Sequence, residues 1–281
     1  MTIKKQSHKI ALVTGASSGI GLATAELLAN AGYTVYGTSR RGGGASGRSF
    51  EMLTLDVTSD ASVADAVTQL MQRQGRIDLL INNAGFGVAP AGAEESSIEQ
   101  AQSIFDTNFF GIVRMTRAVL PHMRQQGAGR IINIGSVLGL LPMPYGALYA
   151  ATKHAIEGYS ESLDHELRTR GIRVSVIEPA YTNTPFDANF MQPDAQLDAY
   201  REARAAVSQR VKEVMATAEK PSVVAETVLK AASAVRPQLR YAAGGLAGRL
   251  TWLRRFAPAA VMDAGIRRDL RLDATAVVTA S

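Results

Sequence analysis

The stretch KIALVTGASSGIG, residues 9–21, decides the fold of this chain. Its apolar first part predicts a buried strand at residues 9–14, and its glycine-bearing second part opens a helical pattern that runs to Ala31. Glycines in a turn between a strand and a helix let the backbone approach a phosphate, and the free N–H groups of the helix N-terminus face its charge. The stretch therefore predicts a dinucleotide-binding turn, although a plain tight turn would also fit these residues alone.

The alternation of strand and helix continues along the chain. Further strands are expected at residues 33–38, 50–55, 79–82, 131–134, 173–178 and 239–242. Helices are expected at residues 60–74, 98–126 and 149–169 and from about residue 221, the second of them broken in pattern near residues 108–111. Residues 41–49 hold Gly42, Gly43, Gly44 and Gly47 and predict a loop instead of a crossover helix. This order predicts a doubly wound α/β fold, with about seven parallel strands covered on both faces.

Composition narrows the class of protein. The chain has 281 residues, of which 46% are hydrophobic, and no cysteine, so disulfides and thiolate metal sites are excluded. The four histidines, His8, His122, His154 and His165, lack the spacing of metal ligands, and no catalytic metal is expected. No signal-peptide pattern and no run of about 18 apolar residues occurs, so we expect a cytoplasmic protein whose residues 1–281 form a single domain.

The net charge is +5 and the pI is about 9.5, and arginines in the last third contribute much of this excess. No nucleic-acid-binding pattern accompanies these arginines. We interpret them as a solvated basic face and expect no nucleic-acid partner.

The glycine spacing is G-x-x-x-G-x-G, from Gly15 through Gly19 to Gly21. Together with Asn82-Asn83-Ala84-Gly85, Ser136 and Tyr149-x-x-x-Lys153, it resembles the single-domain short-chain dehydrogenase/reductase family, in particular carbonyl reductases like the hydroxysteroid and retinol dehydrogenases. The resemblance covers residues 10–184 closely and then loosens. It implies an enzyme that moves a hydride between a nicotinamide and a carbonyl or alcohol carbon. A regulator that binds NADP without catalysis remains an alternative.

Tyr149 and Lys153 are four residues apart on a predicted helix and so share one face. A nearby ammonium favours the phenolate, so we expect Lys153 to lower the pKa of Tyr149 and make it an acid-base group. Ser136 follows a strand at the edge where open α/β sheets bind ligands, and its hydroxyl can donate to a substrate oxygen. The resemblance implies that Lys153 also holds the nicotinamide ribose and that Asn108 holds a water in a proton relay.

The resemblance also implies which residues contact the cofactor. They are Gly15, Ser17, Ser18, Gly19, Ile20, Gly21, Arg40, Asp56, Val57, Asn83, Ala84, Gly85, Tyr149, Lys153, Pro179 and Thr184. Ala180 stands where the family has a glycine, so the resemblance does not fix the backbone path beside the nicotinamide. Asparagines and glycines also shape turns without any ligand.

The end of the second strand indicates NADP(H). An acidic residue about 20 positions past the glycine turn would bind the ribose of NAD, but Ser39 stands there and Arg40 and Arg41 follow. A guanidinium suits a 2′-phosphate, and Arg48 is a second candidate. One feature departs from many NADP-preferring relatives, because Ser18 takes the place of a basic residue. Arg40 and Arg41 could also be solvated charges only.

Residues 181–220 are rich in apolar side chains and correspond to the substrate lid of the family. The flanking stretches 86–88 and 137–145 contribute no charge, so an apolar ketone, aldehyde or alcohol is the expected substrate. A polar or acyl-carrier-linked keto substrate is the alternative, and these side chains could equally pack a core or a subunit contact.

Residues 244–281 form the expected C-terminal extension, where Leu246, Leu250 and Leu253 recur at helical spacing among arginines. Such a helix either docks on its own domain or makes a weak contact with a membrane surface. By resemblance, we expect a homodimer or homotetramer that pairs through the two long helices.

Overall fold

The computed structural model describes residues 9–42, 47–186 and 190–272. The expected Gly43 and Gly44 of the glycine loop, His8 and the last nine residues of the C-terminal extension lie outside these ranges. The strands are β1 (Ile10–Val13), β2 (Thr34–Ser39), β3 (Glu51–Thr54), β4 (Leu79–Asn82), β5 (Gly129–Ile134), β6 (Ile172–Pro179) and β7 (Arg240–Ala243). The helices are α1 (Gly19–Asn30), α2 (Asp60–Gln74), α3 (Ile98–Phe105), α4 (Gly111–Gln126), α5 (Ala147–Leu167), α6 (Arg201–Ala216), α7 (Pro221–Ser233), α8 (Gly245–Phe256) and α9 (Ala259–Asp269).

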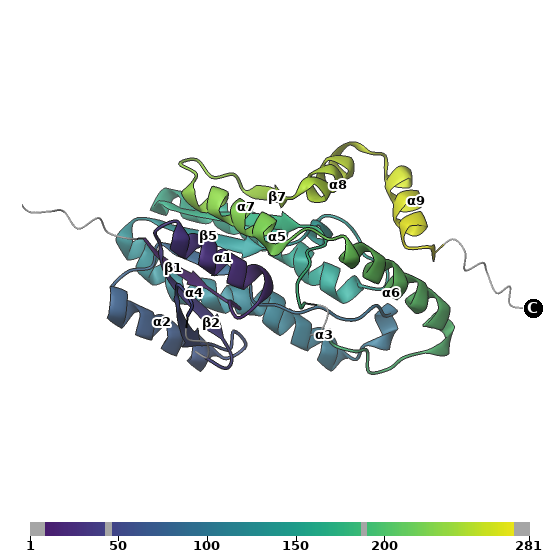
Figure 1. Ribbon diagram of the computed structural model, residues 1–281, viewed down its shortest axis with the longest axis horizontal. Helices are drawn as coiled ribbons and strands as arrows, with labels where there is room; N and C mark the ends of the chain where they lie inside the picture. The colour runs from purple at the N-terminus through teal and green to yellow at the C-terminus, as the bar shows by residue number, and fades with distance from the viewer. Residues whose placement is uncertain (1–8, 43–46, 187–189, 273–281) are drawn as a thin grey trace, which may run out of the picture.

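The strands form one parallel sheet in the order β3-β2-β1-β4-β5-β6-β7, which confirms the expected fold class (Figure 1). The strand order reverses between β1 and β4. These two strands pair directly, with Leu12 opposite Leu80. Crossovers leave this point in opposite directions, so the loops that follow β1 and β4 separate. Ligands of open α/β sheets bind in the crevice that this separation creates.

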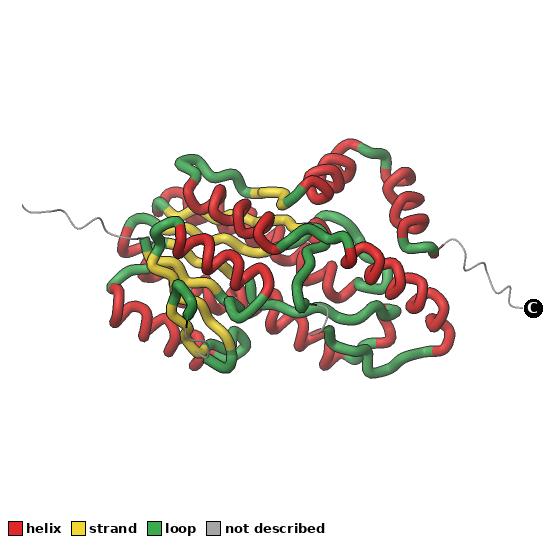
Figure 2. Tube along the Cα trace, viewed as in Figure 1, coloured by secondary structure: helices red, strands yellow, loops and turns green. Residues whose placement is uncertain are grey.

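Alternate residues of each strand enter two cores on opposite faces of the sheet. In β1, Leu12 packs with side chains of α2, α4 and α5, whereas Val13 packs with side chains of α1 and α7. Figure 2 shows these helices in layers against the strands. Burial on both faces explains why the strands are almost continuously apolar.

The long helix expected at residues 98–126 is three segments in the structure. α3 ends at Phe105, a π-helical turn, η2 (Asp106–Phe110), follows, and α4 begins at Gly111. The expected break near residues 108–111 therefore reflects a real change of backbone winding. Such single π-turns are common at functional sites, and this one carries Asn108.

The lid and the C-terminal extension each contain one helix that the sequence did not indicate, α6 and α9. The expected lid contains α6, and the extension contains α8, where a helix was expected, followed by α9. These two helices arch away from the sheet in Figure 1, and α9 returns toward α6. The end of α9 packs on α6 through Leu270 and Val207. In the part of the chain that the structure describes, no helix is both long and apolar enough to cross a bilayer.

Candidate active site

Three of the expected catalytic side chains meet beyond the carboxyl end of β5. Ser136 follows β5 directly and caps a short 3-10 turn, η3 (Val137–Gly139), while Tyr149 lies in the first turn of α5 and Lys153 one turn later. The Ser136 hydroxyl accepts a hydrogen bond from the Leu138 N–H (3.1 Å) and lies 3.4 Å from the Pro179 carbonyl oxygen at the end of β6. The sheet edge therefore fixes the position of Ser136 relative to α5.

The Lys153 ammonium is buried, with 8% of the residue exposed, and Nζ donates to the Ile134 carbonyl oxygen at 2.9 Å. Nζ also lies 5.4 Å from the centroid of the Tyr149 ring. Burial lowers the pKa of Lys153 to about 8, and the Glu157 carboxylate acts in the opposite direction. An ammonium has three donors, and this hydrogen bond to Ile134 uses one of them.

The pKa of Tyr149 differs from the expectation. We expected the Lys153 ammonium to lower it, whereas in the structure burial raises the pKa of Tyr149 above its ordinary value. The reason is that desolvation of the phenol dominates, and Nζ of Lys153 is directed to the backbone of β5. Tyr149 is therefore protonated at neutral pH, which is the state that a proton donor needs.

Asn108 is buried, and its side chain holds the loop after β4. Its Oδ1 accepts from the Phe86 N–H at 3.0 Å, and its Nδ2 donates to the Phe86 carbonyl oxygen at 2.9 Å. Nδ2 also lies 3.4 Å from the Thr152 hydroxyl, which donates to the Tyr149 carbonyl oxygen. The side chain thus joins η2, the loop after β4 and the catalytic helix, while the expected water-holding role of Asn108 stays a prediction.

The glycine turn fits a bound dinucleotide. Gly15 and Gly19 have φ of +66° and +56°, a region that favours glycine. A Cβ on Gly21 would lie 2.3 Å from the Gly15 carbonyl oxygen, and one on Gly19 would lie 3.2 Å from the Thr184 side chain. The first turn of α1 carries no acidic residue, and its N-cap Ser18 makes no side-chain cap hydrogen bond. The free N–H groups there suit a pyrophosphate, and Thr184 lies beside the same turn, as the resemblance implied.

Asn83 supports this turn from the end of β4. Its Nδ2 donates to the carbonyl oxygens of Thr14 and Gly15, at 2.9 and 3.1 Å. The Thr14 hydroxyl in turn accepts from the N–H groups of Asn83 and Ala84. The Asn83 side chain therefore stabilises the glycine turn by hydrogen bonds. This is the turn-shaping role that the sequence left open beside a cofactor contact.

The remaining expected cofactor residues lie along the same sheet edge. The Asp56 carboxylate accepts from the N–H and the hydroxyl of Thr58, and these hydrogen bonds, with Arg40 and Arg114 nearby, lower its pKa. Val57 is part of the core against α4, and Pro179 ends β6. Ala180, in place of the family's glycine, packs with Val137 and Leu141.

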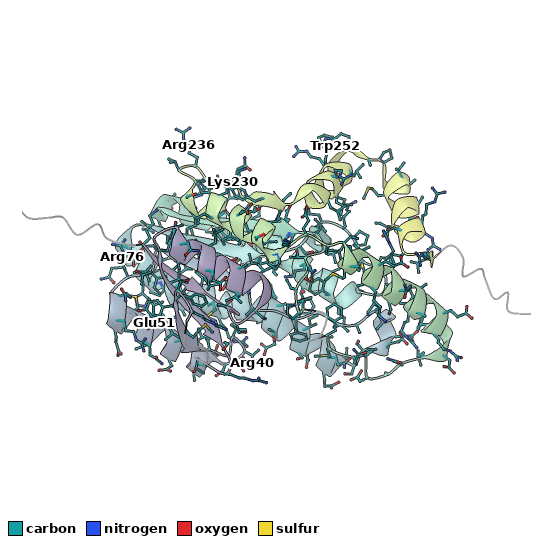
Figure 3. The ribbon with its side chains drawn as sticks, viewed as in Figure 1. Arg40, Glu51, Arg76, Lys230, Arg236 and Trp252 are labelled. Carbon is teal, nitrogen blue, oxygen red and sulfur yellow. The ribbon has the colours of Figure 1, made fainter. Side chains whose placement is uncertain are left out.

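The basic residues after β2 lie near the glycine turn. Arg40 is exposed at the lower edge of Figure 3, directly after Ser39, whose hydroxyl donates to the Gly42 carbonyl oxygen. The Arg48 guanidinium reaches the Ser17 carbonyl oxygen at 3.4 Å. The loop after β2 thus brings positive charge to the turn that would hold the dinucleotide.

Aromatic side chains of the lid cover Tyr149. The Phe186 ring meets the Tyr149 ring edge to face at 6.0 Å, and Phe190 meets Phe186 at 5.5 Å. Both phenylalanines crowd Gly87, where a Cβ would lie 2.7 Å from Phe190. Backbone hydrogen bonds between Met191 and the loop at Gly87 and Ala89 fasten the lid over that loop. The structure therefore brings together the lid and the expected apolar stretch 86–88 above the tyrosine.

A buried ionic cluster behind Lys153 was not anticipated from the sequence. The Arg240 Nε is 2.9 Å from one Glu157 oxygen and 3.6 Å from one Glu178 oxygen. Burial and, to a smaller extent, the nearby Glu157 carboxylate raise the pKa of Glu178 to about 7, while Arg240 acts in the opposite direction. The available signal was Glu178 itself, because a carboxylate inside an otherwise apolar strand needs a partner.

A second buried carboxylate anchors the lid. Glu95 is fully buried, accepts from the N–H groups of Gly92 and Leu197, and forms an ion pair with Arg204 of α6. It therefore ties the lid helix to the body through η1 (Ala93–Glu95). Within the described ranges, no group of three or more His, Asp or Glu side chains is arranged to hold a metal.

Comparisons with known proteins agree with this geometry. Residues 9–195 match the family model of short chain dehydrogenases. A 3-ketodihydrosphingosine reductase of Bacteroides thetaiotaomicron is 47% identical over 182 residues, which cover 64% of this chain and 66% of that protein. Human retinol dehydrogenase 8 is 35% identical over 252 residues, which cover 82% of this chain and 79% of that protein.

Solved structures extend the likeness over nearly the whole chain. A short-chain dehydrogenase of Streptomyces avermitilis superposes with a TM-score of 0.78 at 30% identity, covering 97% of this chain and all of that one. A 3-ketoacyl-(acyl-carrier-protein) reductase of Brucella melitensis with NADH and a serine dehydrogenase with NADP⁺ both superpose at a TM-score of 0.71 and 29% identity. Each superposition covers 83% of this chain. It covers 96% of the Brucella reductase and 93% of the serine dehydrogenase. Similar chains thus carry either nicotinamide cofactor.

Proposed function

Because this chain belongs to the short-chain dehydrogenase/reductase family of oxidoreductases, we propose that it uses NADP(H) to interconvert an apolar ketone or aldehyde and its alcohol. The observation that carries the proposal is the aromatic cover of Phe186 and Phe190 over Tyr149, beside Ser136 and Lys153. It combines an apolar enclosure with the donors that a carbonyl oxygen needs.

The side chains divide the chemistry between them. Bound NADPH supplies the hydride that reaches the carbonyl carbon. Tyr149, which is protonated at neutral pH, gives its phenolic proton to the carbonyl oxygen. Ser136 donates a hydrogen bond to the same oxygen, and Lys153 stabilises the phenolate that remains.

The walls of the site favour an apolar substrate. The covering rings of Phe186 and Phe190 are uncharged, and so are residues 137–145, which pack against α8 and α6 through Leu141 and Met143. A phosphorylated or carboxylated substrate would require a basic side chain in the wall. The names of the two relatives, a 3-ketodihydrosphingosine reductase and a retinol dehydrogenase, denote substrates with long apolar parts.

The preference for NADP(H) rests on the loop after β2. Ser39 stands where an NAD site has its carboxylate, and Arg40 follows it at the surface. Arg48, which reaches Ser17, adds a second guanidinium near the position of a 2′-phosphate.

A substrate panel tests the proposal. Purified protein is assayed with NADPH and with NADH against long-chain ketones, retinoid aldehydes, steroid ketones, 3-ketoacyl thioesters and small charged sugars. We expect the highest kcat/KM for a long apolar carbonyl with NADPH. Preference for charged sugars would refute the apolar site, preference for acyl-carrier thioesters would favour the alternative substrate class, and no turnover with any carbonyl would favour a non-catalytic NADP-binding protein.

We also propose that the chain works as a homodimer or homotetramer. Ile98 of α3 and Phe110 of η2 are 69% and 48% exposed, which leaves an apolar surface beside the long helix α4. Light scattering on purified protein measures the assembly, and a monomer at micromolar concentration would contradict this part of the proposal.

A further inference from the structure

The outer face of α8 is apolar and exposed. Trp252, Leu253 and Phe256 are 61%, 38% and 61% exposed, and Val261 at the start of α9 is 59% exposed. The Trp252 and Phe256 rings lie side by side, with centroids 5.4 Å apart. Figure 3 shows Trp252 at the outermost edge of the molecule, pointing away from the sheet. These four side chains, the α8 patch, remain in contact with water at a hydrophobic cost.

Arginines surround the α8 patch. Arg249 precedes Trp252 by three residues, so both lie on the same side of the helix, and the Arg255 guanidinium rests 5.6 Å from the Phe256 ring. Neither arginine forms an ion pair with any residue in the described ranges. Across residues 245–271 there are six arginines and only two acidic residues, Asp263 and Asp269. The patch is therefore an aromatic centre within a positive rim.

The opposite face of the same helices reaches the catalytic side of the molecule. Ala247 and Leu250 of α8 pack against Val137 and Leu141 in the stretch after Ser136. The Arg254 Nε donates to the Leu140 carbonyl oxygen at 2.9 Å. The helix that carries the α8 patch thus contacts the segment that directly follows Ser136.

We propose that the α8 patch docks the protein on an anionic lipid bilayer. Tryptophan and phenylalanine enter the boundary between headgroups and acyl chains, while arginines around them pair with anionic headgroups. Such an interfacial contact needs no membrane-spanning helix. It goes beyond the proposed reaction, because it concerns the surface on which the protein works.

Two other occupants fit the patch less well. A second copy in a symmetric dimer would bring the same face to itself, so Arg249 and Arg255 of each copy would approach like charges. A nucleic acid would satisfy the arginines but would leave Leu253 and Val261 in water. A bilayer satisfies both the apolar centre and the positive rim.

Trp252 is the only tryptophan of the chain, so fluorescence excited selectively at tryptophan, without the eight tyrosines, reports on this patch alone. Full-length protein is mixed with vesicles of pure phosphatidylcholine and with vesicles of equal parts phosphatidylcholine and phosphatidylserine. We expect the emission to shift to shorter wavelength with the anionic vesicles only, and lipids with brominated acyl chains to quench it. Added salt should weaken the binding, because it screens the arginines.

Variants distinguish vesicle binding through the α8 patch from nonspecific vesicle binding. Trp252→Ser/Phe256→Ser and Arg249→Gln/Arg255→Gln should each reduce co-sedimentation with anionic vesicles by about tenfold or more. The matched control is Val235→Ser/Arg236→Gln, which removes an exposed apolar and an exposed basic side chain just after α7, far from Trp252 in Figure 3. It should bind like the wild type. Thermal unfolding and NADPH binding establish that each variant is folded.

Four results would overturn the proposal. The first is an unchanged emission spectrum of the wild type with anionic vesicles. The second is equal vesicle binding by the wild type and the Trp252→Ser/Phe256→Ser variant. The third is loss of a dimer in that variant, which would assign the patch to another copy. The fourth is displacement of bound vesicles by a single-stranded oligonucleotide, which would assign the patch to nucleic acid.

Discussion

Replacing Lys153 with methionine should stabilise the protein at neutral pH while it destroys catalysis. Burial lowers the pKa of Lys153 from its ordinary 10.5 to about 8, so the folded chain holds this proton less tightly than the unfolded chain does. The difference costs the folded state about 3 kcal/mol at pH 7. Lys153→Met removes that cost but also the hydrogen bond to the Ile134 carbonyl oxygen, which contributes about 1–2 kcal/mol. We expect a net gain of about 1–2 kcal/mol at pH 7 in cofactor-free protein.

The pH dependence of this gain is the sharper test. As pH rises from 8 through 10.5, the unfolded chain loses its extra proton and the penalty on the wild type disappears. The advantage of Lys153→Met should therefore shrink by about 2.5 kcal/mol between pH 7 and pH 10. Urea unfolding of both proteins at the two pH values measures it, and exposed Lys230→Met is the control for loss of a lysine charge. A difference between wild type and Lys153→Met that does not change with pH would refute the burial of a charged ammonium.

Three further predictions concern other parts of the site. Arg40→Ala should raise KM for NADPH about tenfold and leave KM for NADH nearly unchanged, because it removes positive charge near the 2′-phosphate. Steady-state kinetics with each cofactor measure this, and equal losses with both cofactors would contradict it. Glu178→Gln should gain up to about 2 kcal/mol of stability relative to the wild type as pH rises from 5 to 8. The reason is that the pKa of Glu178 is about 7 in the folded chain, above the ordinary 4.5, so the wild type loses stability in that range. Urea unfolding at both pH values measures this gain, and a difference that does not change with pH would exclude it. Phe186→Ala should raise KM for long apolar ketones several-fold more than for short ones, as a series of chain lengths would show, and a uniform loss would mean that the ring does not line the substrate site.

The sheet was predictable because its signals are local. Each strand is a short apolar run bounded by a turn, and both faces are buried, so sequence and structure agree to within one or two residues at most strand ends. The break near Asn108 was also visible, because an asparagine and a glycine interrupt an apolar helical pattern. The pattern does not show what kind of break it is: a π-turn, from which the Asn108 side chain forms hydrogen bonds with the Phe86 backbone.

The parts that escaped prediction depend on partners distant in sequence. α6 has only Ala203 and Val207 buried, and they pack with Leu270, more than sixty positions away, so no local stripe marks the helix. The direction of the pKa shift of Tyr149 could not be foreseen, because the spacing of Tyr149 and Lys153 shows proximity but not burial. Glu178 stands out as a carboxylate in an apolar strand, but the sequence does not show its partner, because only the fold brings Arg240 of β7 to Glu157 and Glu178.

The central claim is that Tyr149 donates the proton in the reduction of an apolar carbonyl by NADPH. The most direct measurement is single-turnover reduction of the best long-chain carbonyl by wild type and by Tyr149→Phe, with NADPH binding measured in parallel by fluorescence. We predict unchanged NADPH affinity and a rate of hydride transfer reduced by at least about a hundredfold, the low end of a general acid's contribution. A variant that keeps a tenth or more of the wild-type rate, a loss of at most about 1.4 kcal/mol, would contradict the account.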